Sequence, residues 1–109
     1  MRSTKDVLQH HLESLAKGDL EEIKRDYAEN ATIITSAQGV HSGKAAIGRF
    51  FEGMLQLLKV GEVKSKAQVL DGKAALFLWE FRSPTMSISD GVDSFFIDEG
   101  LIQYQTMKT

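Results

Sequence analysis

The sequence contains no cysteine, and this excludes both a disulfide framework and a metal site built on thiolates. A single proline, Pro84, lies between two strand-like runs, and no linker rich in proline, glycine or serine interrupts the 109 residues. No apolar run approaches the roughly 18 residues that a membrane-spanning helix needs, and polar residues rather than a signal segment follow Met1. We therefore expect one domain over residues 1–109, located in the cytoplasm and not in a membrane.

The charge balance is close to neutral, with 13 Lys and Arg residues against 15 Asp and Glu residues. A net charge of −2 provides no basic surface for nucleic acid, so nucleic acid is not an expected partner. The three histidines, His10, His11 and His41, do not follow a known metal-ligand spacing, and Gly43 and Gly48 do not form a phosphate loop. The sequence thus predicts neither a metal nor an organic cofactor.

The first sixty residues carry the spacing of three helices. Ser3 can cap the first helix, in whose apolar arc His11 falls, whereas His10 falls outside that arc and is expected in solvent. A short second helix is expected over residues 19–27, with its many charges on a solvated face. A third helix begins near Ser42 and has a wide apolar arc, which must lie against a large apolar surface. That arc consists of Ile47, Phe50, Phe51, Met54, Leu55 and Leu58.

Alternating residues after the third helix predict four long antiparallel strands. The expected strands are residues 62–70, 73–82, 86–97 and 101–107. Asp71-Gly72 is a strong two-residue hairpin signal, residues 89–91 are expected to form a bulge, and strict alternation places Val63 and Val69 on the same face. A small hairpin over residues 31–41 precedes the third helix. Helices followed by a meander of strands indicate the α+β class.

The strand over residues 73–82 has two apolar faces. Phe77 and Trp79 share the aromatic face, which is bulky enough to pack against the third helix. Leu76 and Leu78 lie on the opposite face. In a single sheet with all helices on one side, the cover for these leucines has to come from another subunit. The pattern therefore predicts a homodimer that associates through the outer face of the sheet.

The order of these segments resembles the nuclear transport factor 2-like superfamily, in particular its SnoaL-like and ketosteroid isomerase-like branches. The resemblance covers nearly the whole chain. It is most specific at Gly18-Asp19-Leu20, Ala31-Thr32-Ile33, the helix start from Gly43 to Phe51, and the run from Val92 to Gly100. It implies a cone-shaped, curved antiparallel sheet with three N-terminal helices packed on its concave face. This fold hosts enzymes, binding proteins and assembly modules, so the resemblance alone assigns no activity.

Three positions can be compared with the ketosteroid isomerases. The resemblance places His11 where those enzymes have a tyrosine, and Thr35 where they have the aspartate that acts as base. Asp93 matches their second aspartate, just before an aromatic-rich run. A threonine hydroxyl cannot take a carbon-bound proton near neutral pH without an activating base. Steroid isomerisation by the usual route of that family is therefore not expected.

The remaining polar pair, His11 and Asp93, is the candidate catalytic site at the floor of an apolar cone. The residues expected to contact a ligand are Thr35, Phe51, Trp79, Phe95 and Gln105. We expect the partner to be a small, largely apolar organic molecule whose carbonyl or hydroxyl is fixed by Asp93 and His11. If the protein is an enzyme, the resemblance implies isomerase, cyclase or dehydratase chemistry without a cofactor, with Asp93 similar to the single aspartate of SnoaL-like cyclases.

Three alternatives stay open at this point. Asp93 can bond His11 or the Trp79 indole and so merely satisfy a buried polar group. The protein can also be a non-catalytic dimerisation or association module whose cavity is filled by its own side chains. A weaker hypothesis is an Asp-Arg-Asp site similar to limonene epoxide hydrolases, for which Arg82, Asp90 and Asp93 supply the residue types.

Overall fold

The computed structural model describes residues 1–109 as three helices and six strands. The helices are α1 (Thr4–Lys17), α2 (Leu20–Arg25) and α3 (Lys44–Leu58). The strands are β1 (Tyr27–Thr35), β2 (Gly39–Ser42), β3 (Glu62–Asp71), β4 (Ala74–Arg82), β5 (Ser87–Asp98) and β6 (Leu101–Lys108). This order confirms the α+β class, with the helices in the first half of the chain and a meander in the second.

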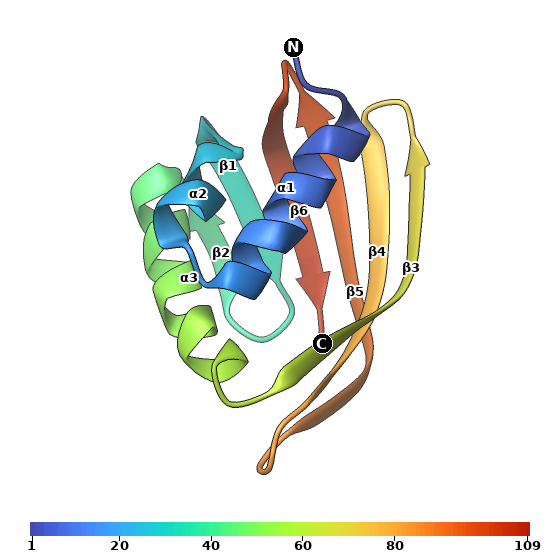
Figure 1. The fold of residues 1–109 in the computed structure, drawn as a ribbon. Helices are drawn as coiled ribbons and strands as arrows, with labels where there is room; N and C mark the ends of the chain where they lie inside the picture. The colour runs from blue at the N-terminus through green and yellow to red at the C-terminus, as the bar shows by residue number, and fades with distance from the viewer.

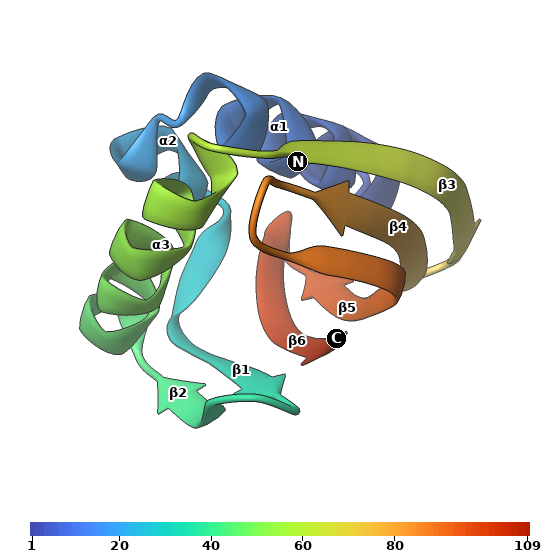
Figure 2. The ribbon, with the colours of Figure 1, turned by 90° about the horizontal axis from the view of Figure 1, so that it is seen from below.

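The six strands form one curved sheet in the order β2-β1-β6-β5-β4-β3. The meander from β3 to β6 is antiparallel, and β1 also pairs antiparallel with β2. Between these two parts, β1 runs parallel to β6, a pairing that the order of the segments did not indicate. The helices cover the concave side of the sheet, as Figures 1 and 2 show from two directions. The curved sheet and the helices together form a cone that is open at one end.

Local signals define the ends of α1. The Ser3 hydroxyl accepts a hydrogen bond from the Asp6 amide at 3.1 Å, and the Asp6 carboxylate accepts one from the Ser3 amide at 3.4 Å. This reciprocal capping box satisfies two amides that the first helical turn leaves free. At the other end, Gly18 takes a left-handed conformation with φ 68°, and its amide donates to the Leu15 carbonyl. The sequence predicted the cap at Ser3.

The second helix is shorter than expected. It ends at Arg25, and Tyr27 is already the first residue of β1 rather than the last residue of a helix. The Ile102 amide donates to the Asp26 carbonyl at 2.7 Å, and Tyr27 pairs with Ile102 of β6. This long-range pairing outweighs the local helical spacing, because helix propensity is a weak preference that tertiary contacts override.

Register shifts interrupt four of the strand pairings, and two of them concern features that the sequence predicted. In β3 the register shifts between Ser65 and Ala67, so that Val63 faces the concave side with Phe81 while Val69 faces outward with Leu76. The expectation that Val63 and Val69 share a face is therefore wrong, because one extra residue in a strand inverts every later side chain. The expected bulge near Ser89-Asp90-Gly91 is confirmed as a register shift between the Trp79 and Phe81 pairings of β4 with β5.

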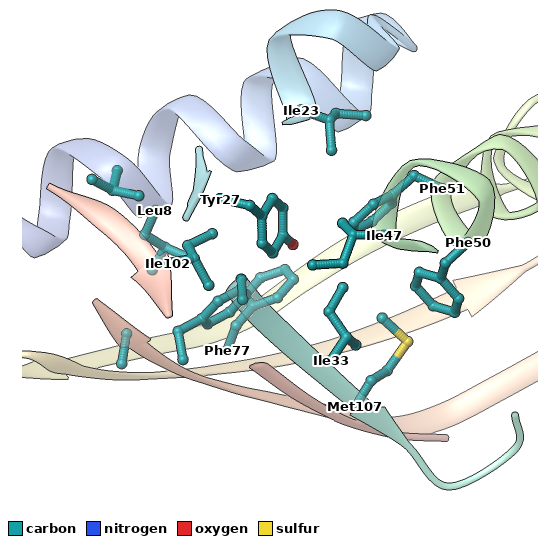
Figure 3. Packing of buried hydrophobic residues seen from close by; sticks show 14 of the residues in the cluster. Leu8, Ile23, Tyr27, Ile33, Ile47, Phe50, Phe51, Phe77, Ile102 and Met107 are labelled. Carbon is teal, nitrogen blue, oxygen red and sulfur yellow. The ribbon is translucent and has the colours of Figure 1, made fainter. Parts of the chain in front are cut away.

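The hydrophobic core lies between the helices and the concave face of the sheet. Figure 3 shows Leu8 and Ile23 from the helices above side chains of the sheet such as Phe77 and Ile33, with Tyr27 between the two layers. All five are buried. The arc expected on the third helix is confirmed where it contributes to this core. Its buried members are Ile47, Phe50, Phe51 and Leu55.

The longest helix of the structure has 15 residues, and none of the helices combines the length and the apolar character that are needed to cross a membrane.

Candidate functional site

A cavity of about 230 Å³ lies between α3, the middle of α1 and the concave face of the sheet. Most of its wall is apolar. The polar residues that line it are His11, Thr35, Gln38, Asp93, Gln105 and Thr109. At one end its wall includes Ala37, Gln38 and Met86, which are exposed on the surface, so the cavity opens to solvent there. A mostly apolar hollow with a few convergent polar groups is the usual form of a small-molecule site.

Asp93 is the one carboxylate in the wall of this cavity, and its residue is only 6% exposed. The Trp79 indole Nε1 donates to Oδ1 of Asp93 at 3.0 Å, and the Gln105 amide Nε2 donates to Oδ2 at 2.8 Å. The three residues come from the neighbouring strands β4, β5 and β6. Each carboxylate oxygen thus has one donor and keeps further acceptor capacity for a ligand.

Tyr27 extends this network by one residue. Its hydroxyl donates to Oε1 of Gln105, and this contact fixes which end of the amide faces Asp93. Tyr27 is completely buried, and burial, reinforced by the negative charges of Asp93 and Asp26, raises its pKa well above the ordinary value. The hydroxyl therefore keeps its proton. The chain Tyr27–Gln105–Asp93–Trp79 is continuous, and every link has a defined donor and acceptor.

The acidity of Asp93 is strongly shifted by its surroundings. Burial raises the pKa of its carboxyl from the ordinary value of 3.8 to about 6, although the hydrogen bonds from Trp79 and Gln105 act in the opposite direction. A carboxyl group with a pKa near 6 is present in both protonation states close to neutral pH. It can therefore donate a proton as well as accept one, which is the property of a general acid-base group.

His11 does not form the expected pair with Asp93. No hydrogen bond joins the two residues, and Nδ1 of His11 is buried without a partner. The imidazole instead packs edge-on against Phe95, Tyr27 and Phe51, with ring centroids 5.5, 5.7 and 5.8 Å away. Burial lowers the pKa of His11 from 6.5 to about 4, against the opposing effect of Asp26. At neutral pH the ring is uncharged, and it lines the cavity.

The other predicted ligand residues are placed around the same cavity with one exception. Phe51, Trp79 and Gln105 line it. Thr35 lines it too, but its hydroxyl accepts a bond from the Gln38 amide at 2.8 Å and so secures the turn between β1 and β2. Phe95 is not part of the wall; it is buried behind His11 and supports the imidazole.

The Asp-Arg-Asp alternative is not supported by the geometry. Arg82 is exposed at the end of β4, on the solvent side of the strand. Asp90 is also exposed and lies 3.5 Å from the Lys66 ammonium. Only Asp93 is in the cavity. The structure also contains no group of three or more His, Asp or Glu side chains placed to hold a metal ion.

Sequence reasoning missed a buried polar cluster next to the cavity. Asp26 was expected on a solvated helix face, yet it is completely buried. Its carboxylate accepts from the Arg2 guanidinium at 2.7 Å, and Nδ1 of His10 lies 2.8 Å from both of its oxygens. His10, expected in solvent, is thus a structural partner. No local signal indicated this cluster, because the strand that begins at Tyr27 was itself not expected from the sequence.

The curved sheet, the three helices and the open cavity with its buried acid define a cone of the nuclear transport factor 2-like type. Residues 8–105 match the family model of the SnoaL-like domain, and the chain therefore belongs to the SnoaL-like domain family. The resemblance on which the expected fold was based is thereby confirmed. No curated protein matches the chain.

Solved structures with the same fold share few identical residues with this chain. A nuclear transport factor 2-like protein of unknown function from Cytophaga hutchinsonii aligns at a TM-score of 0.82 and 14% identity, over 98% of this chain and 89% of its own. A candidate polyketide cyclase from Sinorhizobium meliloti aligns at 0.81 and 19%, over 94% and 93%. An epoxide hydrolase/cyclase-like enzyme of pyran ring formation in the polyether salinomycin aligns at 0.82 and 21%, over 96% and 88%. At such identities the likeness shows the fold alone.

Proposed function

We propose that this protein binds a compact, largely apolar organic molecule in the cavity and holds a carbonyl or hydroxyl group of that molecule at Asp93. The observation that carries the proposal is the placement of Asp93, whose carboxylate is buried in the wall of an apolar hollow with two fixed donors. A buried acid with a raised pKa in a cavity is a frequent mark of a functional site. The volume of about 230 Å³ speaks against the alternative of a filled cavity.

The chemistry that fits this site is proton transfer without a cofactor. In its acid form Asp93 donates a hydrogen bond to a carbonyl oxygen of the ligand, and in its carboxylate form it accepts a proton from a hydroxyl or an acidified carbon. Hydrogen bonds from the Trp79 indole and the Gln105 amide keep the carboxyl in place. Isomerase, cyclase and dehydratase reactions all involve proton transfer, which such a group can carry out. One protein of the same fold is an epoxide hydrolase/cyclase-like enzyme of pyran ring formation, which supports cyclase chemistry as one of these options.

The size of the cavity restricts the ligand. Typical small-molecule pockets occupy about 300–1,000 Å³, so a volume of about 230 Å³ favours a molecule of one or two rings over a four-ring steroid. The opening beside Met86 and Gln38 gives such a molecule a path to Asp93. With Thr35 engaged in the turn, Asp93 is the one carboxyl group in the wall and has to serve as both acid and base.

Ligand retention tests the proposal. The protein is incubated with one- and two-ring ketones, enols and phenols, with a steroid as a size control, and bound species are measured by native mass spectrometry and NMR. We expect at least one compact compound to bind, with an affinity at least tenfold weaker in Asp93→Asn. Asp90→Asn, the same change at an exposed position three residues earlier, is the control. Absence of binding across the panel, or equal affinity in both variants, contradicts the proposal.

We further propose that the protein functions as a homodimer joined through the convex face of the sheet. Residues opposite each other on neighbouring strands share a face, and the pairs Val69–Leu76 and Phe96–Tyr104 place exposed apolar groups on this one. The positions between them carry uncharged side chains. These are Thr32, Ser94 and Thr106. The uncharged centre of this face can meet its own copy across a two-fold axis without burying a charge.

Sedimentation velocity tests the dimer. We expect the wild type to sediment as a dimer and Phe96→Glu to sediment as a folded monomer, because the new carboxylates would face each other across the interface. Ala45→Glu, an exposed change on α3 and away from the sheet, is the control for an added surface carboxylate. A wild type that remains monomeric at high concentration contradicts the proposed assembly, and the cavity proposal stands independently of this result.

A further inference from the structure

A second hollow lies on the outer surface, separate from the cavity that contains Asp93. It is a groove of about 690 Å³ between the junction of α1 with α2 and one face of α3. These three segments lie side by side in both Figure 1 and Figure 2. Leu15, Leu20 and Leu58 form apolar parts of its wall. Leu15 and Leu58 also line the inner cavity, so they are the partition between the two hollows.

The charges around this groove are mainly positive. Lys17, Arg49 and Lys59 line it, against one carboxylate, Glu52. None of these four side chains belongs to an ion pair within 4.0 Å. The rim therefore presents unneutralised positive charge beside an apolar surface, which is complementary to a molecule with an apolar body and a negative head.

Arg49 is the one cation of the groove that neither lies at a helix end nor forms an ion pair. Lys17 and Lys59 stand at the C-terminal ends of α1 and α3, where a positive charge offsets the helix dipole. Arg49 lies in the first half of α3, away from that end, and has no carboxylate partner. A guanidinium can hold a carboxylate or sulfonate with two parallel hydrogen bonds. The negatively charged group of such a molecule would therefore lie next to Arg49, and its apolar part would lie against the leucines.

Gly53 provides an independent observation at the same place. It lies inside α3, where glycine is disfavoured relative to every residue except proline. A Cβ atom at Gly53 would meet nothing within 4 Å, so packing does not require glycine there. At Gly48, by contrast, a Cβ would touch the Lys24 side chain at 3.4 Å. Gly53 lines the groove, and the missing side chain keeps its floor open.

We infer that this groove is a binding site for an amphiphilic monoanion, an aromatic or alkyl body of about two rings that carries one carboxylate or sulfonate. The body lies over Gly53 against Leu20 and Leu58, and the anion is held by Arg49. Because the groove and the inner cavity share Leu15 and Leu58 but no polar group, occupancy of the groove does not require Asp93. The inference thus goes beyond the function proposed for the cavity.

Two fluorescent probes that differ by one charged group test this site. 8-Anilinonaphthalene-1-sulfonate carries a sulfonate, and N-phenyl-1-naphthylamine is the same ring system without it. We expect the wild type to bind the anionic probe about tenfold more tightly than the neutral one, the preference that one charge-assisted contact gives. We expect Arg49→Glu to abolish the preference for the anionic probe. Lys5→Glu makes the same change in net charge at an exposed position of α1, and this variant should keep the preference.

Gly53→Leu tests the location of the probe. The leucine fills the floor of the groove and is a better helix former than glycine, so binding of both probes is lost while the melting temperature rises. A loss of binding then cannot result from unfolding. Equal affinity for the two probes in the wild type, or unchanged binding in Gly53→Leu, overturns the inference. Binding that is lost in Asp93→Asn but kept in Gly53→Leu assigns the probe to the inner cavity and also overturns it.

Discussion

The indole ring of Trp79 lies directly against the backbone of Gly91, its cross-strand partner on β5. A Cβ atom at Gly91 would come within 2.3 Å of two ring carbons, a distance that no real contact shows. The same indole donates to Asp93 two residues further along the strand. Gly91 thus gives the ring the space from which Trp79 can reach the carboxylate, and a backbone position outside the cavity wall determines the hydrogen bonding within it.

Gly91→Ala is expected to destabilise the fold by about 1–3 kcal/mol, the range for overpacking a close-packed core. The ring of Trp79 has to move, and its hydrogen bond to Asp93 is weakened. Urea denaturation measures the free energy of unfolding. Trp79 is the only tryptophan, so its fluorescence and its indole N–H resonance report the displacement directly. Gly53→Ala, where a Cβ meets nothing, is the control and should not destabilise the protein. An unchanged indole resonance in Gly91→Ala would contradict this account.

The two buried titratable groups at the cavity make opposite contributions to stability as the pH changes. The pKa of Asp93 is raised to about 6 in the folded state, so its contribution is fully present below the unfolded value of 3.8 and is lost as the pH rises to about 6. The pKa of His11 is lowered to about 4, so its contribution is present above 6.5 and is lost as the pH falls to about 4. Each of the two pKa shifts changes the free energy of unfolding by about 3 kcal/mol over its pH interval.

In the wild type these two contributions largely cancel between pH 4 and pH 6. We expect the free energy of unfolding of Asp93→Asn to rise more steeply with pH over this interval than that of the wild type, because only the His11 contribution remains. His11→Gln should show the reverse, a relative fall with increasing pH. Denaturation in urea at several pH values measures both slopes. Parallel curves for the three proteins would show that neither group is shifted as described.

Tyr27→Phe removes one hydroxyl and leaves the ring in place. Oε1 of Gln105 then loses its donor, and an unsatisfied buried acceptor costs about 1–3 kcal/mol. The Gln105 amide is no longer fixed, so its bond to Asp93 weakens and the pKa of Asp93 is expected to rise above about 6. Carbon-13 NMR of the carboxyl group measures this pKa. Tyr104→Phe, an exposed change on β6, is the control. A titration of Asp93 that does not move in Tyr27→Phe contradicts the role of the hydroxyl.

The sequence predicted the parts of the fold that depend on local signals. Ser3, Asp6 and Gly18 define α1 through contacts within a few residues, and Asp71-Gly72 joins β3 to β4 as its turn chemistry indicates. Alternation along β4 also placed Trp79 on the aromatic face of that strand, and the bond from its indole to Asp93 is one of the two that the sequence left open. These features need no knowledge of distant parts of the chain.

The parts that were missed depend on long-range pairing. Tyr27 belongs to β1 because β6, seventy-five residues later in sequence at Ile102, pairs with it. The extra residue at Lys66 inverts the second half of β3, and no local pattern distinguishes a bulge there from regular alternation. Helical periodicity correctly placed His11 on the buried face of α1. It gives the direction of a side chain, however, and not the identity of its neighbours. It could not show that the imidazole packs against three aromatic rings and makes no hydrogen bond to Asp93.

The cluster around Asp26 gives the last prediction. Its carboxylate is completely buried, whereas its partner Arg2 is 37% exposed and also donates to the Gly100 carbonyl at 2.8 Å. Removing one member of a buried ion pair costs about 3–5 kcal/mol because the other charges lose their partner. Asp26→Asn is therefore expected near the lower end of that range. Arg2→Ala should cost only about 1 kcal/mol, since its charge is partly solvated and His10 remains bound to Asp26.

Urea denaturation of the two variants, with Arg25→Ala as an exposed control, measures whether Asp26→Asn costs more stability than Arg2→Ala. The N-terminal segment is held only through Arg2 and its neighbours, so amide hydrogen exchange near Gly100 should accelerate in Arg2→Ala while exchange in the centre of β6 stays slow. The physical reason is that Arg2 ties the start of the chain to the β5–β6 turn through the Gly100 carbonyl. Equal losses in the two variants would mean that the exposed arginine, and not the buried carboxylate, carries the stability of the cluster.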